Sequence, residues 1–199
     1  MSTETAQLFF ALLTFVAAGG TIGIVVLRIA AAAGSDGAVR LGAMISEEGV
    51  HLAFIVAAVS TLGSLYFSEV AEFVPCRLCW FQRIAMYPLS VVLLVGAIRR
   101  DAAVRWYAGP LAVIGAIIAG YHTLIEWRPE LDTGTCDLSG PSCTAVWFRE
   151  FGFVSLALMS LVGFLTILAL LFVRFPATMD STDGSNTDSP NPPSTKDVS

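Results

Sequence analysis

The architecture is decided around residues 75–83, Pro-Cys-Arg-Leu-Cys-Trp-Phe-Gln-Arg, where two cysteines separated by two residues open an apolar helix. The positive end of a helix dipole stabilises a thiolate over a thiol, so a Cys-x-x-Cys pair at a helix start can carry redox chemistry. The uncharged residues that follow, 84–98, are too few to cross a bilayer, which takes about 20 residues. Gln82 and Arg83 must therefore belong to the span, and the cysteines are expected at the boundary between water and lipid.

Composition places the whole chain in a membrane. Of its 199 residues, 55% are apolar and 14% charged, and the mean hydropathy of +0.73 excludes an ordinary soluble domain. The net charge of −5 is spread over termini and loops, with no basic stripe of the kind that binds nucleic acid. Four cysteines in two pairs favour an oxidising, extracytoplasmic face of the membrane.

The apolar pattern predicts an all-α integral membrane protein with five spans. These are expected at residues 8–27, 50–68, 79–98, 106–125 and 151–173. The first run could instead be a signal peptide, because residues 31–33 are all alanine and resemble a cleavage site. It is longer than the usual apolar region of such a peptide, and Glu4 precedes it without any Lys or Arg, so we interpret it as a span. Residues 34–49 are expected to form a short polar link.

Arginine and lysine residues predict the topology. The turn between the third and fourth spans holds Arg99, Arg100 and Arg105, and such clusters stay in the cytoplasm. Counting spans outward from it places seven of the 11 Lys and Arg residues inside. Both cysteine pairs then lie on the outer face.

Several motifs together resemble one known family. They are Leu-Gly-Ser-Leu-Tyr-Phe-Ser-Glu at residues 62–69, Pro-Cys-Arg-Leu-Cys-Trp-Phe-Gln-Arg-Ile-Ala-Met-Tyr-Pro at 75–88, Gly-Pro-Ser-Cys at 140–143 and Phe-Gly-Phe at 151–153. The chain resembles the disulfide bond formation protein B (DsbB) family, and most of all its BdbC branch, over about residues 50–173. The resemblance implies a four-transmembrane-helix bundle, here preceded by one additional transmembrane helix. It also implies three parts: residues 1–49, the extra helix and a cytoplasmic link; residues 50–175, the redox bundle; and residues 176–199, a disordered cytoplasmic tail.

The resemblance further implies an activity. Members of the family are membrane thiol:quinone oxidoreductases that reoxidise a thioredoxin-fold, DsbA-like thiol oxidase on the outer face of the plasma membrane. They pass the electrons to the membrane quinone pool, ubiquinone or menaquinone. Applied to this chain, the redox-active disulfides are Cys76–Cys79 and Cys136–Cys143. Cys136 receives the partner's thiolate, Cys143 attacks Cys76, and Cys79 is released beside the quinone.

Two further residues are candidates for the quinone site. Arg83 lies on the same helix face as Cys79 and about 6 Å deeper, where its charge can lower the pKa of Cys79 and stabilise a reduced quinone oxygen. Spacing alone allows Arg83 to extend to the interface instead; the resemblance places it at the quinone. His122, one turn before Glu126, can give the quinone a hydrogen bond or proton, or be an interface histidine without such a role.

Other functions remain open from the residues alone. Cys76 and Cys79 could be an inert structural disulfide or half of a zinc site, but a four-cysteine zinc site usually has a second pair with the same close spacing. Cys136 and Cys143 are seven positions apart, which suits a disulfide-closed loop, so no metal is expected. A vitamin K epoxide reductase-like enzyme would have its loop cysteines before the Cys-x-x-Cys pair. Here Cys76 and Cys79 come first, which argues against that class. A non-enzymatic membrane scaffold with structural disulfides is the remaining alternative.

One departure from the family pattern concerns the second pair. In the DsbB branch, a longer segment with an amphipathic helix separates the two loop cysteines, and seven positions leave no room for one. How this short loop docks on the membrane does not follow from the sequence.

Overall fold

A computed structural model of the chain describes residues 2–132 and 141–172, which form helices and no extended strand. Within these two ranges, six α-helices carry the fold: α1 Thr3–Ala32, α2 Asp36–Glu47, α3 Gly49–Leu65, α4 Arg77–Arg99, α5 Arg105–Trp127 and α6 Leu156–Phe172. Short turns extend or connect them: a π-helical turn at Tyr66–Val70 and 3₁₀ turns at Ala102–Val104 and Pro129–Leu131.

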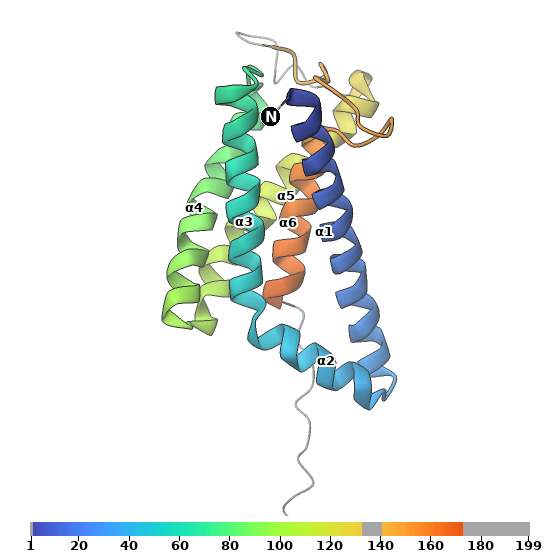
Figure 1. Cartoon of the computed structure of the whole chain (residues 1–199), viewed down its shortest axis with the longest axis vertical. Helices are drawn as coiled ribbons and strands as arrows, with labels where there is room; N and C mark the ends of the chain where they lie inside the picture. Colours follow the sequence, from blue (N-terminus) through green and yellow to red (C-terminus); the bar gives the residue numbers. More distant parts are fainter. Residues whose placement is uncertain (1, 133–140, 173–199) are drawn as a thin grey trace, which may run out of the picture.

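Helices α3 to α6 form a bundle, and α1 packs along α6 beside it (Figure 1). Among the described residues, four helical segments are long and apolar enough to cross a membrane: Thr3–Ala32, Gly49–Val70, Arg77–Arg99 and Ala102–Trp127. Helix α6 is apolar over its 17 residues. The expected all-α membrane fold with an additional N-terminal helix is therefore confirmed.

The bundle is held together by close helix packing around small residues. The ring of Phe164 is fully buried and lies against Gly115 of α5, where any side chain would collide with it. Alanines at positions 53, 57, 108, 112 and 119 are buried in the same core. Lipid provides no hydrophobic force between helices, so association in membranes depends on such close packing.

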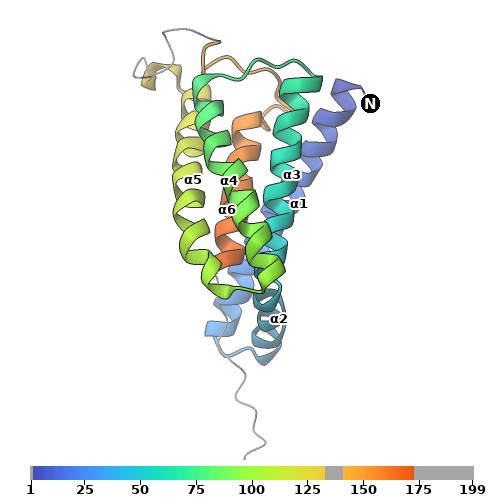
Figure 2. The ribbon, with the colours of Figure 1, turned by 90° about the vertical axis from the view of Figure 1, so that its left-hand side faces the viewer.

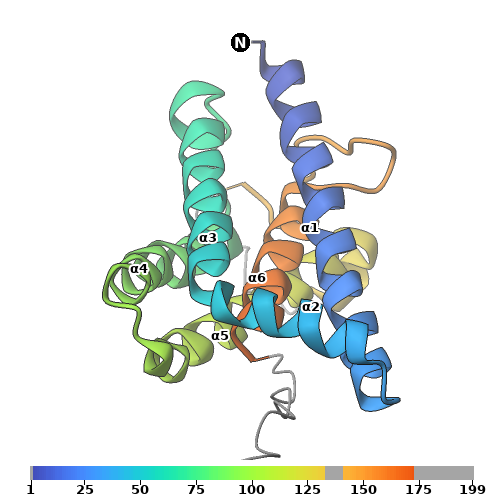
Figure 3. The ribbon, with the colours of Figure 1, turned by 60° about the horizontal axis from the view of Figure 1, so that its bottom comes forward.

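Residues 34–49 form a helix rather than the expected link. Ser35 is the N-cap residue before α2, without a side-chain capping hydrogen bond, and Asp36 lies in the first turn, where an acidic side chain complements the helix dipole. Helix α2 crosses below the bundle from α1 to α3 (Figure 3) and buries Ala38 and Gly42. Only four of its 12 residues have polar or charged side chains, but they interrupt the apolar ones, so no apolar run is long enough to indicate a span.

The last helix begins later than predicted. Residues 151–155 are apolar enough for a span, yet Phe151 and Gly152 adopt left-handed backbone angles, with φ of 53° and 79°. Glu150 and Val154 form an isolated bridge around this turn. Helix α6 therefore begins at Leu156, and residue 173, its expected end, lies outside the described residues along with the tail.

The two ends of the bundle differ in what they carry. The N-terminus, the segment that enters α4 and the segment that enters α6 lie at one end; α2 and the α4–α5 turn lie at the other (Figure 2). Cys76 and Cys143, from different pairs, are therefore at the same end, opposite the arginine-rich turn.

We predict that Gly115→Ala destabilises the bundle, because the new methyl group overlaps a fully buried Phe164 ring. The expected cost is about 1–3 kcal/mol, or a melting temperature several degrees lower in detergent. Gly120→Ala on the same helix is the matched control, since the added carbon would lie 3.9 Å from Leu161, an ordinary contact. Equal melting temperatures for the two variants would contradict this packing.

Candidate functional site

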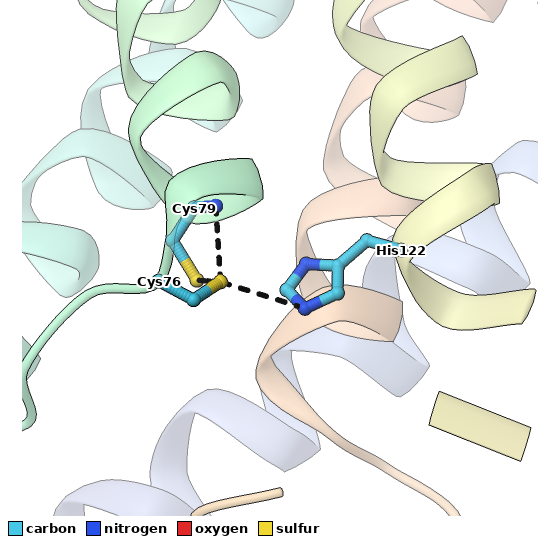
Figure 4. Close-up of side chains that lie close together, drawn as sticks. All are labelled: Cys76, Cys79 and His122. Carbon is cyan, nitrogen blue, oxygen red and sulfur yellow. Dashed lines mark hydrogen bonds between the residues drawn. The ribbon is translucent and has the colours of Figure 1, made fainter. Parts of the chain in front are cut away.

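The Cys-x-x-Cys pair forms the first turn of α4. Cys76 is the N-cap: its Sγ accepts a hydrogen bond from the Cys79 backbone N–H at 3.3 Å. The two Sγ atoms lie 2.8 Å apart, and both residues are thiols in this structure (Figure 4). The expected Cys76–Cys79 disulfide is thus represented by its dithiol form, with the two sulfurs next to each other.

Hydrogen bonds converge on Cys76. The Cys79 thiol is the largest cause that lowers the pKa of Cys76, from 9.0 to about 4. Burial raises this pKa, and a hydrogen bond from His122 lowers it further. From the sequence, the charge of Arg83 was expected to favour a thiolate on Cys79. In the dithiol, the thiolate is stabilised on Cys76. A lowered thiol pKa stabilises the reduced pair, which makes the corresponding disulfide a better electron acceptor.

His122 links the two cysteine pairs. It projects from α5, is 3% exposed, and its Nε2 lies 3.7 Å from Cys76 Sγ and 3.2 Å from the Cys143 carbonyl oxygen. The side-chain amide of Gln82 donates to Nδ1 at 3.0 Å. Nδ1 is then the acceptor, so Nε2 carries the proton that is directed at Cys76 and Cys143.

Gln82 and Glu126 are site residues that the sequence analysis did not assign. Gln82 is buried one turn after Cys79, and an uncharged polar residue inside a span was the available signal. The buried Glu126 carboxylate accepts a hydrogen bond from Ser155 and lies 3.9 Å from His122 Nε2. Arg149 donates to the Glu126 carbonyl at 2.9 Å, which ties the segment before α6 to the end of α5.

Arg83 points across to α3. Its Nε donates to Ser64 Oγ at 3.0 Å and its Nη2 to the Ser64 carbonyl at 3.1 Å. The guanidinium also lies 5.3 Å from the Trp80 ring. Within the described part of the chain, no carboxylate forms an ion pair with it. The cation is therefore fixed by neutral partners and keeps its positive charge inside the helix bundle.

A cavity of about 380 Å³ lies between α1, α3, α4 and α6. Cys79, Gln82, Arg83 and His122 line one part of it, with Ser64 and Tyr87 nearby; most of the remaining wall is apolar. Cys76 is not part of this wall and instead packs in a buried cluster with Leu78, Ile125 and Cys143. Cys79 also packs against this cluster, but it is the cysteine of the pair that lines the cavity, so the dithiol has one face on the cavity and one toward the segment of Cys143.

The second cysteine pair is described in part. Cys143 is fully buried and disulfide-bonded; Cys136 lies outside the described residues. The ligand atoms of Cys76, Cys79 and His122 all lie within 4.8 Å of one another, close enough to hold a metal ion together. This three-residue set combines the cysteine pair with a histidine from another helix, whereas the sequence analysis considered only a site built from four cysteines.

A family model described as "Disulfide bond formation protein DsbB" matches residues 46–174. The chain belongs to the DsbB family. Its motifs had indicated this resemblance, which is confirmed. The match begins after α1, so the additional helix and most of α2 lie outside the family's common part.

Relatives place the chain in the BdbC-like branch of the DsbB family. "Probable disulfide formation protein C 2" of Bacillus anthracis is 42% identical over 125 residues, which are 63% of this chain and 89% of the relative. "Disulfide bond formation protein C" of Bacillus subtilis is 37% identical over 122 residues, 61% of this chain and 88% of the relative. No solved structure gives a significant match. As a DsbB-family member, the chain is a membrane oxidoreductase of disulfide bond formation.

We predict that the low pKa of Cys76 depends on a hydrogen-bond donor at position 79. In a chain with Cys136 and Cys143 changed to serine, Cys79→Ser keeps a donor and Cys79→Ala removes it. The thiolate absorbance of Cys76 should persist to lower pH in the Ser variant, while in the Ala variant the pKa should move back toward 9.0. Because folding lowers this pKa, thiolate formation stabilises the reduced fold fully above pH 9.0, and this contribution disappears as the pH falls toward about 4.

Identical titrations of the two variants would show that a neighbour other than residue 79 sets the pKa of Cys76. The chain with both Cys76 and Cys79 changed to serine in the same background has no cysteine left and provides the blank, since it has no thiolate absorbance to titrate.

Proposed function

We propose that the chain is a membrane thiol:quinone oxidoreductase. It reoxidises an extracytoplasmic thioredoxin-fold, DsbA-like thiol oxidase by disulfide exchange and transfers the electrons to membrane quinone. The observation that carries this proposal is the two-faced dithiol: Cys79 lines an apolar cavity, while Cys76 lies against the segment that holds Cys143.

The residues around the cavity fit a quinone. A prenylated quinone has a flat polar ring with two carbonyl acceptors and a long apolar tail. The cavity offers amide, guanidinium and imidazole groups beside Cys79, and apolar walls elsewhere. Its volume of about 380 Å³ lies in the usual range for small-molecule sites. Either ubiquinone or menaquinone meets this description, and when bound it would accept two electrons and two protons.

The proposed disulfide exchange uses the four cysteines of this chain, and each disulfide bond that forms replaces one that breaks. A thiolate of the reduced partner attacks Cys136 of the Cys136–Cys143 disulfide, and closure of the partner's own disulfide releases Cys136 and Cys143 as thiols. Cys143 then attacks Cys76 of the Cys76–Cys79 disulfide, which frees Cys79 as a thiolate facing the cavity. Cys136 then attacks Cys143 of the Cys143–Cys76 disulfide, which restores the Cys136–Cys143 disulfide and releases Cys76. The net result is one oxidised partner and one reduced Cys76, Cys79 pair.

His122 is suited to assist this exchange. One nitrogen, Nε2, lies within hydrogen-bonding distance of both Cys76 Sγ and the Cys143 carbonyl. Its N–H can stabilise the Cys76 thiolate that is released when the Cys143–Cys76 disulfide is resolved. Arg83, held beside Cys79 by Ser64, supplies positive charge on the cavity side.

The site is proposed to face the outside of the plasma membrane. The segments that enter α4 and α6, which carry Cys76 and Cys143, lie at the bundle end opposite the arginine-rich α4–α5 turn (Figure 2). The positive-inside rule favours the cytoplasm for the arginine-rich turn and so the exterior for the cysteines.

The central test uses purified protein in detergent with a reduced thioredoxin-fold partner and added quinone. Quinone absorbance should fall in proportion to the partner thiol oxidised, one quinone for each dithiol. A structural scaffold would keep both disulfides closed and consume no quinone. A zinc protein would carry about one equivalent of metal after purification, bound through Cys76, Cys79 and His122.

We predict that Arg83→Gln weakens use of the quinone and not of the thiol partner. Loss of the charge should raise the apparent KM for quinone about tenfold or more, since a charge-assisted hydrogen bond contributes about 1.5–3 kcal/mol. The KM for the partner should stay unchanged. Arg99→Gln, in the last turn of the same helix and outside the cavity wall, is the matched control.

We predict that Cys136→Ala abolishes capture of the partner. With a partner whose resolving cysteine is changed to serine, the wild-type chain should accumulate a mixed disulfide that non-reducing electrophoresis resolves. A complex that still forms with the Cys136→Ala chain would assign partner attack to another cysteine.

A further inference from the structure

The wall of the cavity includes a helix that the family match does not cover. Phe10, Leu13, Thr14, Val16 and Ala17 of α1 line it, whereas the match begins at residue 46. Helices α1 and α3 lie on either side of α6 (Figures 1 and 3). Helix α1 thus closes a side of the cavity that the four-helix bundle alone would leave to lipid.

Packing at the outer end fixes α1 in this position. The ring of Phe10 lies against Gly63 of α3, where an added Cβ would be 2.7 Å from Phe10 Cε1. The same ring lies 5.4 Å from the ring of Phe67. Phe15 contacts Phe151 at 5.5 Å between ring centroids. These contacts hold α1 both to α3 and to the turn before α6.

A hydrogen bond fixes the middle of α1. The hydroxyls of Thr21 and Thr166 lie 2.9 Å apart, joining α1 to α6. Hydroxyl pairs of this kind hold helices together within a membrane. With its lower end joined to α2, α1 is a fixed part of the bundle and not a loosely attached anchor.

The cavity has an uneven distribution of polarity. The groups able to bind a quinone ring come from α4 and α5, namely Cys79, Gln82, Arg83 and His122. The α1 side offers methyl, methylene and phenyl surface, and Thr14 turns its hydroxyl back to the Phe10 carbonyl at 2.8 Å. A ring bound at the polar side would therefore direct its tail along α1.

We propose that α1 forms the binding surface for the isoprenoid tail of the quinone, between α3 and α6. This inference rests on the proposed function and adds to it a chain-specific part of the site. The ring would be held by the common bundle, and the tail by a helix that lies outside the family match. Ala17 and Thr14, one turn apart on α1, are then residues that determine affinity for the tail.

The test fills the α1 side of the cavity and measures binding by tail length. Ala17→Phe and Thr14→Phe each place a ring in the space proposed for the tail. Gly19→Phe adds the same ring to the same helix at a position with open space around it. Binding is followed by quenching of tryptophan fluorescence, because Trp147 lines the cavity. The probes are menadione, which has no tail, menaquinone with a four-unit tail, and the corresponding pair of ubiquinones.

The filled variants should bind the tailed quinones at least about tenfold more weakly, because the added ring takes the space in which the tail would pack. Tail-free quinones should bind the same variants within about twofold of wild type, which also shows that the ring site is still folded. Gly19→Phe should bind both kinds normally. Unchanged affinity for tailed quinones in Ala17→Phe and Thr14→Phe, or an equal loss for both kinds, would overturn the role of α1. A wild-type chain that binds no quinone at all would overturn the proposed function instead.

Discussion

The imidazole of His122 joins three segments that are far apart in the sequence. Its Nδ1 accepts from Gln82 of α4, while its Nε2 is directed at Cys76 before α4 and at the Cys143 carbonyl before α6. A polar group buried in a membrane protein is costly unless its hydrogen bonds are satisfied, so this set of partners defines how α4, α5 and the outer segment meet. The position of the dithiol relative to the second cysteine pair follows from that one side chain.

The same constraint separates the two faces of the dithiol. Cys76 collects hydrogen bonds and packs among buried residues, while Cys79 borders the cavity. Arg83 brings a positive charge to the cavity side without an acidic partner in the described part of the chain, because Ser64 holds its guanidinium. The proposed thiol exchange and the proposed electron transfer to quinone would therefore take place on opposite sides of one helical turn.

Much of this arrangement could be predicted from the sequence, because it depends on local patterns. Apolar runs located the spans, and the spacing of Cys76, Cys79 and Arg83 placed them on the first turns of one helix. Features set by distant contacts could not be predicted. The turn before α6 is as apolar as a span, and only the backbone of Phe151 and Gly152 shows where the helix begins. Similarly, nothing in residues 3–32 indicates that Thr14 and Ala17 border a cavity next to Cys79.

The N-cap of α4 has a consequence for the timing of the reaction. As a thiolate, the Cys76 sulfur is a charged acceptor for the Cys79 backbone N–H, and it has no such charge in a mixed disulfide. The first turn of α4 is then held by a weaker cap and becomes freer to fray. Fraying would give Cys79 a wider range of motion while Cys76 is in the mixed disulfide, and release of Cys76 as a thiolate would tighten the turn again. Redox state and local helix stability are in this way coupled through one backbone amide.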